Sequence, residues 1–253
     1  MSKSDPIRKD HFDAVETFDK ISEWLFYLSA GLSFISLFVE KCNSALYDGV
    51  LISFASSVLA LFVVGLFLRL YLTPRADDSR RHDFFSSACG VNLTHQQTEG
   101  YYNNNFGDPI KRIAAQVFEN SHFSKAIARH MAIRERIKVG VYVLVWIVCV
   151  INRKTEIGLI LAASQAVFSE QIVSKFVRLE WLRMRFERTY ETMYHLFQSS
   201  PSKVPFTAIA LNTMTMYEAT KSNAAITLNS KLFDKMNSDL SVQWEQIKTA
   251  LKM

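Results

Sequence analysis

Four charge-free apolar segments of unequal length divide the chain: Trp24–Val39, Gly49–Leu68, Val139–Ile151 and Ile157–Ser169. At ~1.5 Å per residue the second covers ~30 Å, which is one hydrocarbon thickness. The third and fourth reach only about 20 Å as helices, so they cross a bilayer only if flanking Lys138 and Lys175 extend toward the headgroups. We expect four spans in two hairpins. A two-span protein, with the second hairpin embedded or soluble, is the structural alternative.

Lysine and arginine are distributed asymmetrically around these segments. The two turns expected on the outer side of the membrane hold only Lys41, Arg153 and Lys154. The flanks expected inside hold many more: Lys3, Arg8, Lys9, Lys20, Arg69, Arg75, Arg80, Arg81, Arg129, Arg134, Arg136, Lys138, Lys175, Arg178, Arg183, Arg185 and Arg188. Because basic residues concentrate on the cytoplasmic side, this bias predicts that both termini and the middle of the chain are cytoplasmic.

The predicted fold class is therefore an all-α polytopic membrane protein. Its expected parts are an N-terminal helix (1–23), a first transmembrane hairpin (24–72), a cytoplasmic helical insert (73–137), a second hairpin (138–177) and a helical cytoplasmic tail (178–253). Only 8 Gly and 5 Pro support long helices. In the N-terminal helix, Phe12, Val15, Phe18 and Ile21 recur at helical spacing and form a face for packing or for the membrane surface.

Helix signals divide the insert. Asp77, Asp78 or Ser79 is expected to cap a helix that runs through Ala88 and ends at Gly90. Asp108-Pro109 opens the next helix, and Asn120 or Ser121 is expected to cap another that leads toward the third span.

The fourth segment is expected to continue as one unbroken helix from Ile157 to Gln198, because no Gly or Pro lies between Leu159 and Ser200. Ser199-Ser200-Pro201 ends it, and two further helices follow, 204–219 and 231–251. Spacings of three and four also predict a packed seam, within the chain or between subunits, formed by Leu179, Leu182, Phe186, Thr189, Met193 and Leu196.

Polar residues in and after the fourth segment are the main functional candidates: Ser164, Gln165, Glu170, Gln171 and Ser174, with Ser169 between them. On a continuous helix, Ser164, Gln171 and Ser174 share one stripe. A carboxylate in hydrocarbon costs about 2.5–3.5 kcal/mol on insertion scales, so Glu170 should face protein or water. One interpretation is a pore or ion path. The other is that Glu170 lies at the headgroup boundary and pairs with a Lys or Arg of another helix.

A second candidate is the loop before Asp108, where Tyr101, Tyr102, Asn103 and Asn104 offer stacking faces and amides suited to a nucleobase. The alternative is a surface loop folded on its own asparagine side chains.

His82, Cys89 and His95 match no zinc spacing, so no metal or other cofactor is expected. No catalytic motif is recognisable, and an enzyme has no positive support. The net charge is +5, and the basic residues cluster beside the apolar segments. This placement favours membrane topology over nucleic-acid binding.

The run Arg80-Arg81-His82-Asp83-Phe84-Phe85-Ser86-Ser87-Ala88-Cys89-Gly90, together with the order of spans, insert and tail, resembles the four-span pore-forming effectors that accompany nucleotide-synthesising enzymes in bacterial anti-phage systems (the S-4TM type). The resemblance implies a membrane-disrupting effector, switched on by a nucleotide second messenger or a cytoplasmic partner protein. We expect an inner-membrane protein that forms homo-oligomers and opens a pore or disturbs the bilayer. No residue-level binding site transfers with it. A membrane scaffold or receptor that recruits a soluble partner is the alternative function.

Overall fold

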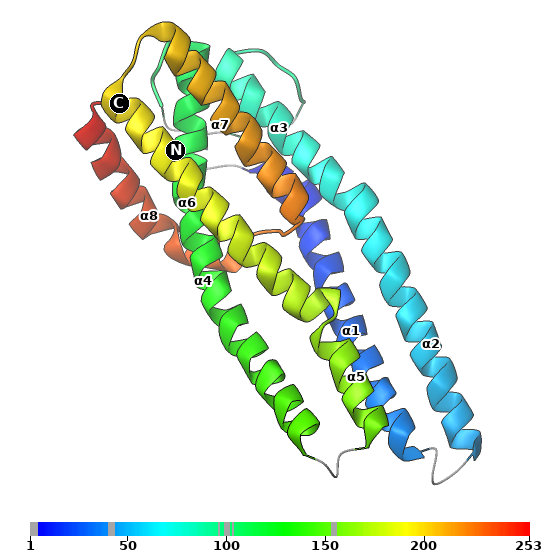
Figure 1. Ribbon diagram of the computed structural model, residues 1–253. Helices are drawn as coiled ribbons and strands as arrows, with labels where there is room; N and C mark the ends of the chain where they lie inside the picture. The colour runs from blue at the N-terminus through cyan, green and yellow to red at the C-terminus, as the bar shows by residue number, and fades with distance from the viewer. Residues whose placement is uncertain (1–4, 40–43, 96, 99–101, 103, 153–155) are drawn as a thin grey trace. The chain divides into compact units, whose positions relative to one another are not determined.

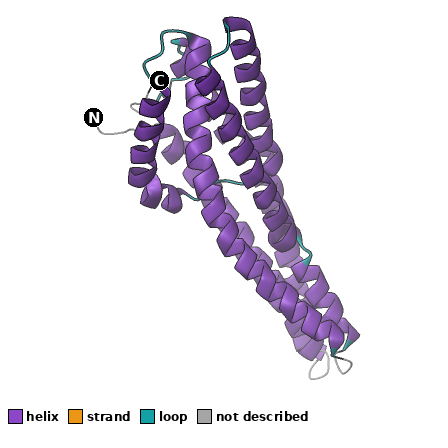
Figure 2. Ribbon diagram, turned by 60° about the vertical axis from the view of Figure 1, so that its left-hand side comes forward, coloured by secondary structure: helices purple, strands orange, loops and turns teal. Residues whose placement is uncertain are grey.

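The computed structural model describes residues 5–39, 44–95, 97–98, 102, 104–152 and 156–253. Within these residues every regular element is a helix, as Figures 1 and 2 show. The chain forms two compact units. Unit 1 consists of Met1–Asp13, Pro74–Ile133 and Arg178–Met253, and unit 2 consists of Ala14–Thr73 and Arg134–Val177. The all-α prediction is confirmed.

Unit 1 is a helical bundle with a densely aromatic core. Its elements are η1 (Arg8–Phe12), α3 (Thr73–Cys89), the first part of α4 (Pro109–Ile151), most of α6 (Lys175–Ser199), α7 (Lys203–Ala224) and α8 (Ser230–Leu251). Phe118 of α4 is fully buried, with its ring centroid 5.0 Å from that of Trp244 and 5.8 Å from that of Phe197. Aromatic pairs of this kind add to the stabilisation that comes from buried area alone.

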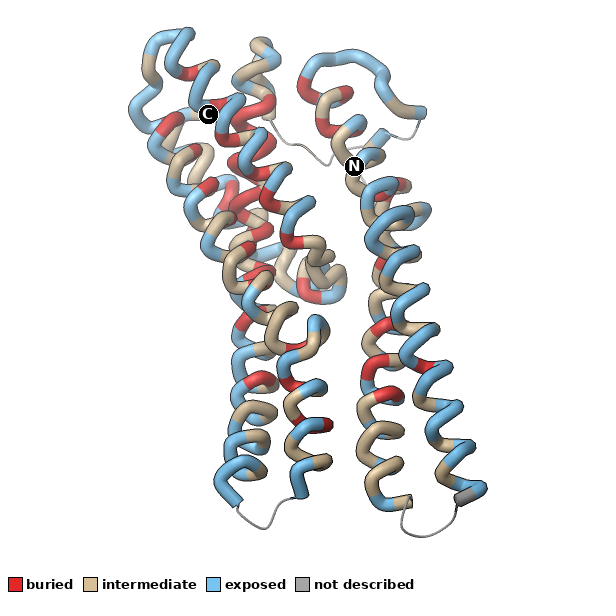
Figure 3. Tube along the Cα trace, turned by 45° about the vertical axis from the view of Figure 1, so that its right-hand side comes forward, coloured by how far each residue is buried: buried red, intermediate tan, exposed pale blue. Residues whose placement is uncertain are grey.

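The predicted seam on α6 is confirmed. All six of its positions are buried, and the apolar ones among them join the core formed by α4, α7 and α8. Figure 3 shows buried positions concentrated where these helices pack. A stripe with spacings of three and four faces one side of a helix, so burial within the chain accounts for the whole pattern.

Several helix ends in unit 1 also agree with the sequence. Helix α3 ends at Cys89, and Gly90 follows with φ +70°, the left-handed conformation that glycine adopts without strain. Asp108 precedes α4, and its Oδ1 accepts a hydrogen bond from the Ile110 N–H at 2.8 Å. Helices α7 and α8 begin within one residue of their predicted starts.

Two predicted helix starts in the insert are wrong. Helix α4 runs through Asn120 and Ser121 without interruption, and the Ser121 hydroxyl donates to the backbone oxygen of Phe118 instead of capping a new helix. Helix α3 does not begin at Asp77–Ser79 either, because it continues from the π-helical turn η2 (Leu68–Leu72). In that wider turn the Thr73 N–H bonds to the Leu68 oxygen, which lets the helix continue through Pro74 although proline has no N–H to donate.

Unit 2 contains α1 (Asp13–Val39), α2 (Ser44–Phe67), η2, the end of α4, α5 (Ile157–Val167) and η3 (Glu170–Ser174). The ends of its two hairpins, at Val39 and Ser44 and at Ile151 and Ile157, lie at the same end of the unit (Figure 1). Its buried apolar cluster is small and consists of Phe26, Val139 and Ile172.

Among the described residues, three helical runs are long and apolar enough to cross a membrane: Arg8–Val39, Ala45–Cys89 and Ile157–Ser199. The apolar end of α4 is not one of them, because the charged residues from Arg134 to Lys138 directly precede it. Only 6% of the most apolar window in Ala45–Cys89 is buried within the structure. Most of this apolar surface is therefore available to lipid or to another protein.

Candidate functional site

The candidate site in unit 2 is shaped by a break in the predicted continuous helix. Helix α5 ends at Val167, Ser169 is extended with ψ 164°, and the π-helical turn η3 starts at Glu170. The Phe168 ring packs edge-on against Trp146 of α4, with centroids 5.1 Å apart. The prediction of one unbroken helix from Ile157 to Gln198 is therefore wrong. No Gly or Pro lies at the break. It coincides instead with the tertiary packing of Phe168 on Trp146.

Because of the break, the polar candidates do not form the single stripe that a continuous helix would give. Ser164 lies before it, on α5, and its hydroxyl accepts a hydrogen bond from Trp146 Nε1 at 2.8 Å. Gln165 is exposed, and Ser174 is half-buried at the end of η3. Ser164 thus contacts α4, whereas the residues that follow the break contact α1 and η2.

Glu170 forms an interhelical ion pair. Its Oε1 lies 3.1 Å from Nη2 of Arg69 in η2, and both side chains are more than half exposed. This is the arrangement of the second interpretation, in which Glu170 pairs with a basic residue of another helix.

Gln171 and Lys175 face α1. The Gln171 Nε2 donates to the Ser22 hydroxyl at 3.1 Å, and Ser22 is only 2% exposed. One helical turn further, Lys175 Nζ lies 3.3 Å from Asp19 Oδ2. Asp19 and Ser22 are three residues apart and lie on one face of α1, so the two contacts form a single polar strip between α1 and the segment after the break.

A third ion pair joins α1 to α4. Lys138 Nζ lies 3.1 Å from Glu23 Oε1 and 5.4 Å from the centroid of the Tyr27 ring. Together with the pairs above, this contact defines a polar belt in unit 2 that connects α1, η2, α4, η3 and the start of α6. Its members are Asp19, Ser22, Glu23, Arg69, Lys138, Glu170, Gln171 and Lys175.

The sequence predicted two members of the belt as site residues, Glu170 and Gln171, and named Lys138 and Lys175 only as flanks of the spans. It missed the α1 residues. A signal for them was present: Asp19, Ser22 and Glu23 follow helical spacing directly before a charge-free segment. That pattern fits a polar helix face that meets polar partners at the edge of an apolar unit.

The second candidate, the tyrosine–asparagine loop, lies in unit 1. Tyr101 and Asn103 fall outside the described residues. Tyr102 is half-buried with its ring edge-on to Phe84, at 5.9 Å between centroids, and Asn104 is also half-buried. Tyr102 therefore contributes to packing on α3, and its ring is not displayed as a free stacking surface.

Two residues of the Arg80–Gly90 segment on α3 accept hydrogen bonds from the loop that follows this helix. Asp83 is 2% exposed, and its two carboxylate oxygens accept hydrogen bonds from the N–H and the hydroxyl of Thr98, at 2.9 and 2.7 Å. The Ser86 hydroxyl accepts from the Leu93 N–H at 3.0 Å. Asp83 and Ser86 therefore hold the loop after α3 against that helix.

Comparisons with protein-family models, with curated proteins and with solved structures gave no match to this chain.

Proposed function

We propose that the protein is a bacterial inner-membrane effector that oligomerises and forms a pore or disrupts the bilayer when it is triggered through its cytoplasmic helices. The observation that carries this proposal is the polar belt, which places three interhelical ion pairs and a buried amide–hydroxyl bond in a unit whose helices otherwise present apolar side chains. Charged groups next to hydrocarbon are costly unless they face one another or water, and in membrane proteins they mark functional paths.

In this proposal four helices cross the membrane and both termini are cytoplasmic. The third crossing in chain order is the apolar end of α4, where Val141, Leu144 and Val148 are each more than half exposed and suit contact with lipid. Helix α5 has 11 residues and reaches about 16 Å, so the second hairpin needs local thinning of the bilayer. A hairpin that is shorter than the bilayer is thick, and that has polar residues directly after α5, is suited to disturbing a membrane.

The trigger that we propose is helix α6. Its first residue, Lys175, pairs with Asp19 in the polar belt, while its buried seam belongs to the core of unit 1. A change in the packing of that seam would be transmitted along a rigid helix to the Lys175–Asp19 pair. The setting in anti-phage defence, with a nucleotide or a partner protein as the signal, rests on the resemblance of the Arg80–Gly90 run.

The deciding experiment measures membrane potential with a dye in cells after induced expression of the full chain, with and without phage challenge. We expect the wild type to depolarise the cells under an activating condition. Glu170→Leu combined with Gln171→Leu should abolish the response, because it removes contacts to both η2 and α1. The matched control is Gln243→Leu, an exposed glutamine on α8 that is neither in the polar belt nor among the candidate pore residues. An intact potential under every condition would refute the proposal.

Topology is tested separately, by fusing a cytoplasm-active and a periplasm-active reporter to each terminus. Four spans with both ends inside predict signal from the cytoplasmic reporter at both termini. Opposite compartments for the two ends would rule out this arrangement.

A scaffold or receptor is the second candidate. Helix α7 favours it, because apolar residues are exposed along one side of it, including Val204 at 79% and, seven residues on, Leu211 at 39%. An exposed apolar helix face in a soluble unit is typical of a surface that docks another protein. Recovery of one stoichiometric partner, lost on Val204→Glu and unaccompanied by ion leak, would favour this function over pore formation.

A further inference from the structure

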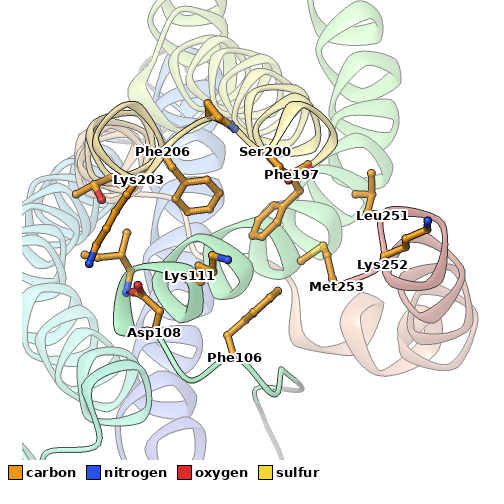
Figure 4. A pocket seen from close by; sticks show the side chains of 13 residues that line it. Phe106, Asp108, Lys111, Phe197, Ser200, Lys203, Phe206, Leu251, Lys252 and Met253 are labelled. Atoms are coloured by element: carbon orange, nitrogen blue, oxygen red, sulfur yellow. Dashed lines mark hydrogen bonds between the residues drawn. The ribbon is translucent and has the colours of Figure 1, made fainter.

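A cavity of about 380 Å³ opens in unit 1 where the starts of α4 and α7 meet the ends of α6 and α8. Figure 4 shows Lys111 extending into its middle, beneath the rings of Phe197 and Phe206, with Lys203 and Lys252 on opposite flanks. The volume falls in the range of small-molecule sites. The sequence did not group these residues into a site, because the lining comes from three separated stretches of chain.

The charge of the lining is predominantly positive. Three lysine side chains, Lys111, Lys203 and Lys252, face a single carboxylate side chain, that of Asp108. Asp108 already accepts a hydrogen bond from the Ile110 N–H at the start of α4. Among the described residues, none of the three ammonium groups forms an ion pair. Like charges gathered without partners repel one another, and a bound anion removes that repulsion.

Aromatic rings form the apolar part of the lining. Phe106 stacks on Phe197 with centroids 6.0 Å apart and 23° between the ring planes, and Phe206 meets Phe197 edge-on at 5.7 Å. Phe106 is held in place because Arg112 Nε donates to its backbone oxygen. Unlike Phe197 and Phe206, which are buried, Phe106 remains half-exposed, so one more flat ring can stack at this edge of the cluster.

The start of α7 adds a further attraction for anions. Helix α7 has 22 residues, and its N-cap residue Ser202 makes no side-chain hydrogen bond to the first turn. In that turn Pro205 has no N–H and the Phe206 N–H donates to the Ser202 oxygen at 3.1 Å, so the N–H groups of Lys203 and Val204 are the donors that remain for an anion. The helix dipole also places partial positive charge beside Lys203.

We propose that this cavity binds a small organic anion in which a phosphate group is carried on a flat aromatic ring. The phosphate lies between Lys111 and Lys203 at the start of α7, and the ring stacks against Phe106. Lys252 closes the opposite flank. This binding does not require the protein to span or permeabilise a membrane, so its test is independent of the pore proposal.

The test is calorimetric titration of the full chain, in nonionic detergent, with 1-naphthyl phosphate. Inorganic phosphate and the neutral 1-naphthalenemethanol are titrated in parallel. We expect one site for 1-naphthyl phosphate and at least tenfold weaker binding of the two parallel probes, because each offers only half of the recognised chemistry. Affinity should also fall as salt rises, since the contacts are ionic.

Variants separate the site from general attraction to a basic protein. Lys111→Met and Lys203→Met should each weaken binding of 1-naphthyl phosphate about five- to tenfold, and Phe106→Leu should weaken it about threefold. Lys231→Met is the matched control, because Lys231 is an exposed lysine at the start of α8, outside the cavity. Lys111→Arg should bind nearly as the wild type does.

The proposal is overturned if the Lys111→Met, Lys203→Met double variant binds 1-naphthyl phosphate as tightly as Lys231→Met does. It is equally overturned if 1-naphthalenemethanol binds as well as the phosphate ester. All the altered lysines are exposed, so an unchanged thermal unfolding curve is expected for each lysine variant and confirms that their comparison concerns binding.

Discussion

Arg69 and Glu170 lie 101 residues apart in the sequence, and their side chains meet with 3.1 Å between Nη2 and Oε1. Each belongs to a π-helical turn, Arg69 to η2 and Glu170 to η3. A π-helical turn widens the helix and redirects its side chains relative to a continuous α-helix, and such turns are frequent at functional sites. The pair therefore joins the two hairpins of unit 2 at positions where both backbones depart from regular geometry.

Reversing one charge of this pair should destabilise unit 2, and reversing both should restore it. Glu170→Arg places two guanidinium groups together, whereas Arg69→Glu with Glu170→Arg recreates the attraction. Because both side chains are more than half exposed, we expect a coupling of only about 0.5–1 kcal/mol in water. Thermal unfolding of the purified chain in detergent measures it. The Glu16–Lys20 pair, which lies within α1, serves as the control for a charge swap that joins no two helices.

The Ser22–Gln171 bond should behave as a buried polar pair. Ser22→Ala removes the acceptor and leaves the Gln171 amide without it, which should cost about 1–2 kcal/mol. Gln171→Leu added to Ser22→Ala should recover much of that loss, since both polar groups are then gone. A double-mutant cycle by thermal unfolding gives the coupling, and strictly additive effects would contradict the contact.

Two glycines in unit 2 should respond differently to alanine. A Cβ on Gly158 would lie 3.2 Å from Leu37 Cδ2, whereas a Cβ on Gly140 meets nothing within 4 Å. Alanine in a helix interior gains about 0.5–1 kcal/mol over glycine. We expect that full gain for Gly140→Ala in unfolding experiments. Gly158→Ala should gain less, and Gly158→Leu should destabilise the protein because it pushes α5 away from α1.

Unit 1 should lose stability as the pH falls through the range where His122 would titrate. Burial, and then the charge of Lys125, lower the pKa of His122 to about 4 from the ordinary 6.5. The imidazole Nε2 lies 3.3 Å from the Leu240 oxygen and is therefore assigned the proton, while Nδ1 has no hydrogen-bond partner among the described residues. A second proton would leave a buried charge and a buried donor without an acceptor.

The sign follows from linkage. Above pH 6.5 the imidazole is neutral in both the folded and the unfolded chain, so the full stability is present. Between pH 6.5 and about 4 only the unfolded chain binds the proton, and the free energy of unfolding falls by up to about 3 kcal/mol. His122→Leu should flatten this part of the pH profile relative to His130→Leu, which alters an exposed histidine. Parallel profiles for the two variants would contradict the assignment.

The local features that the sequence predicted correctly are those set by neighbouring residues. Gly90 ends α3, Asp108 caps α4, and the six seam positions of α6 are buried together. Each depends on helical periodicity or on the conformation of one or two residues, so a single stretch of sequence contains the whole cause. The three long apolar runs follow in the same way, from composition alone.

Tertiary structure decided the rest. The helix break at Phe168–Ser169 accompanies the packing of Phe168 on Trp146, which no local signal reveals. Gln171 finds Ser22 at a separation of 149 residues, and Phe106 and Phe197 stack to line a cavity. The sequence alone determined where this protein is helical and where it is apolar, because backbone propensity and hydrophobicity are local. Packing between distant segments decided which polar groups form contacts. A charged group or an amide can bond only to a group that the fold places within hydrogen-bonding distance.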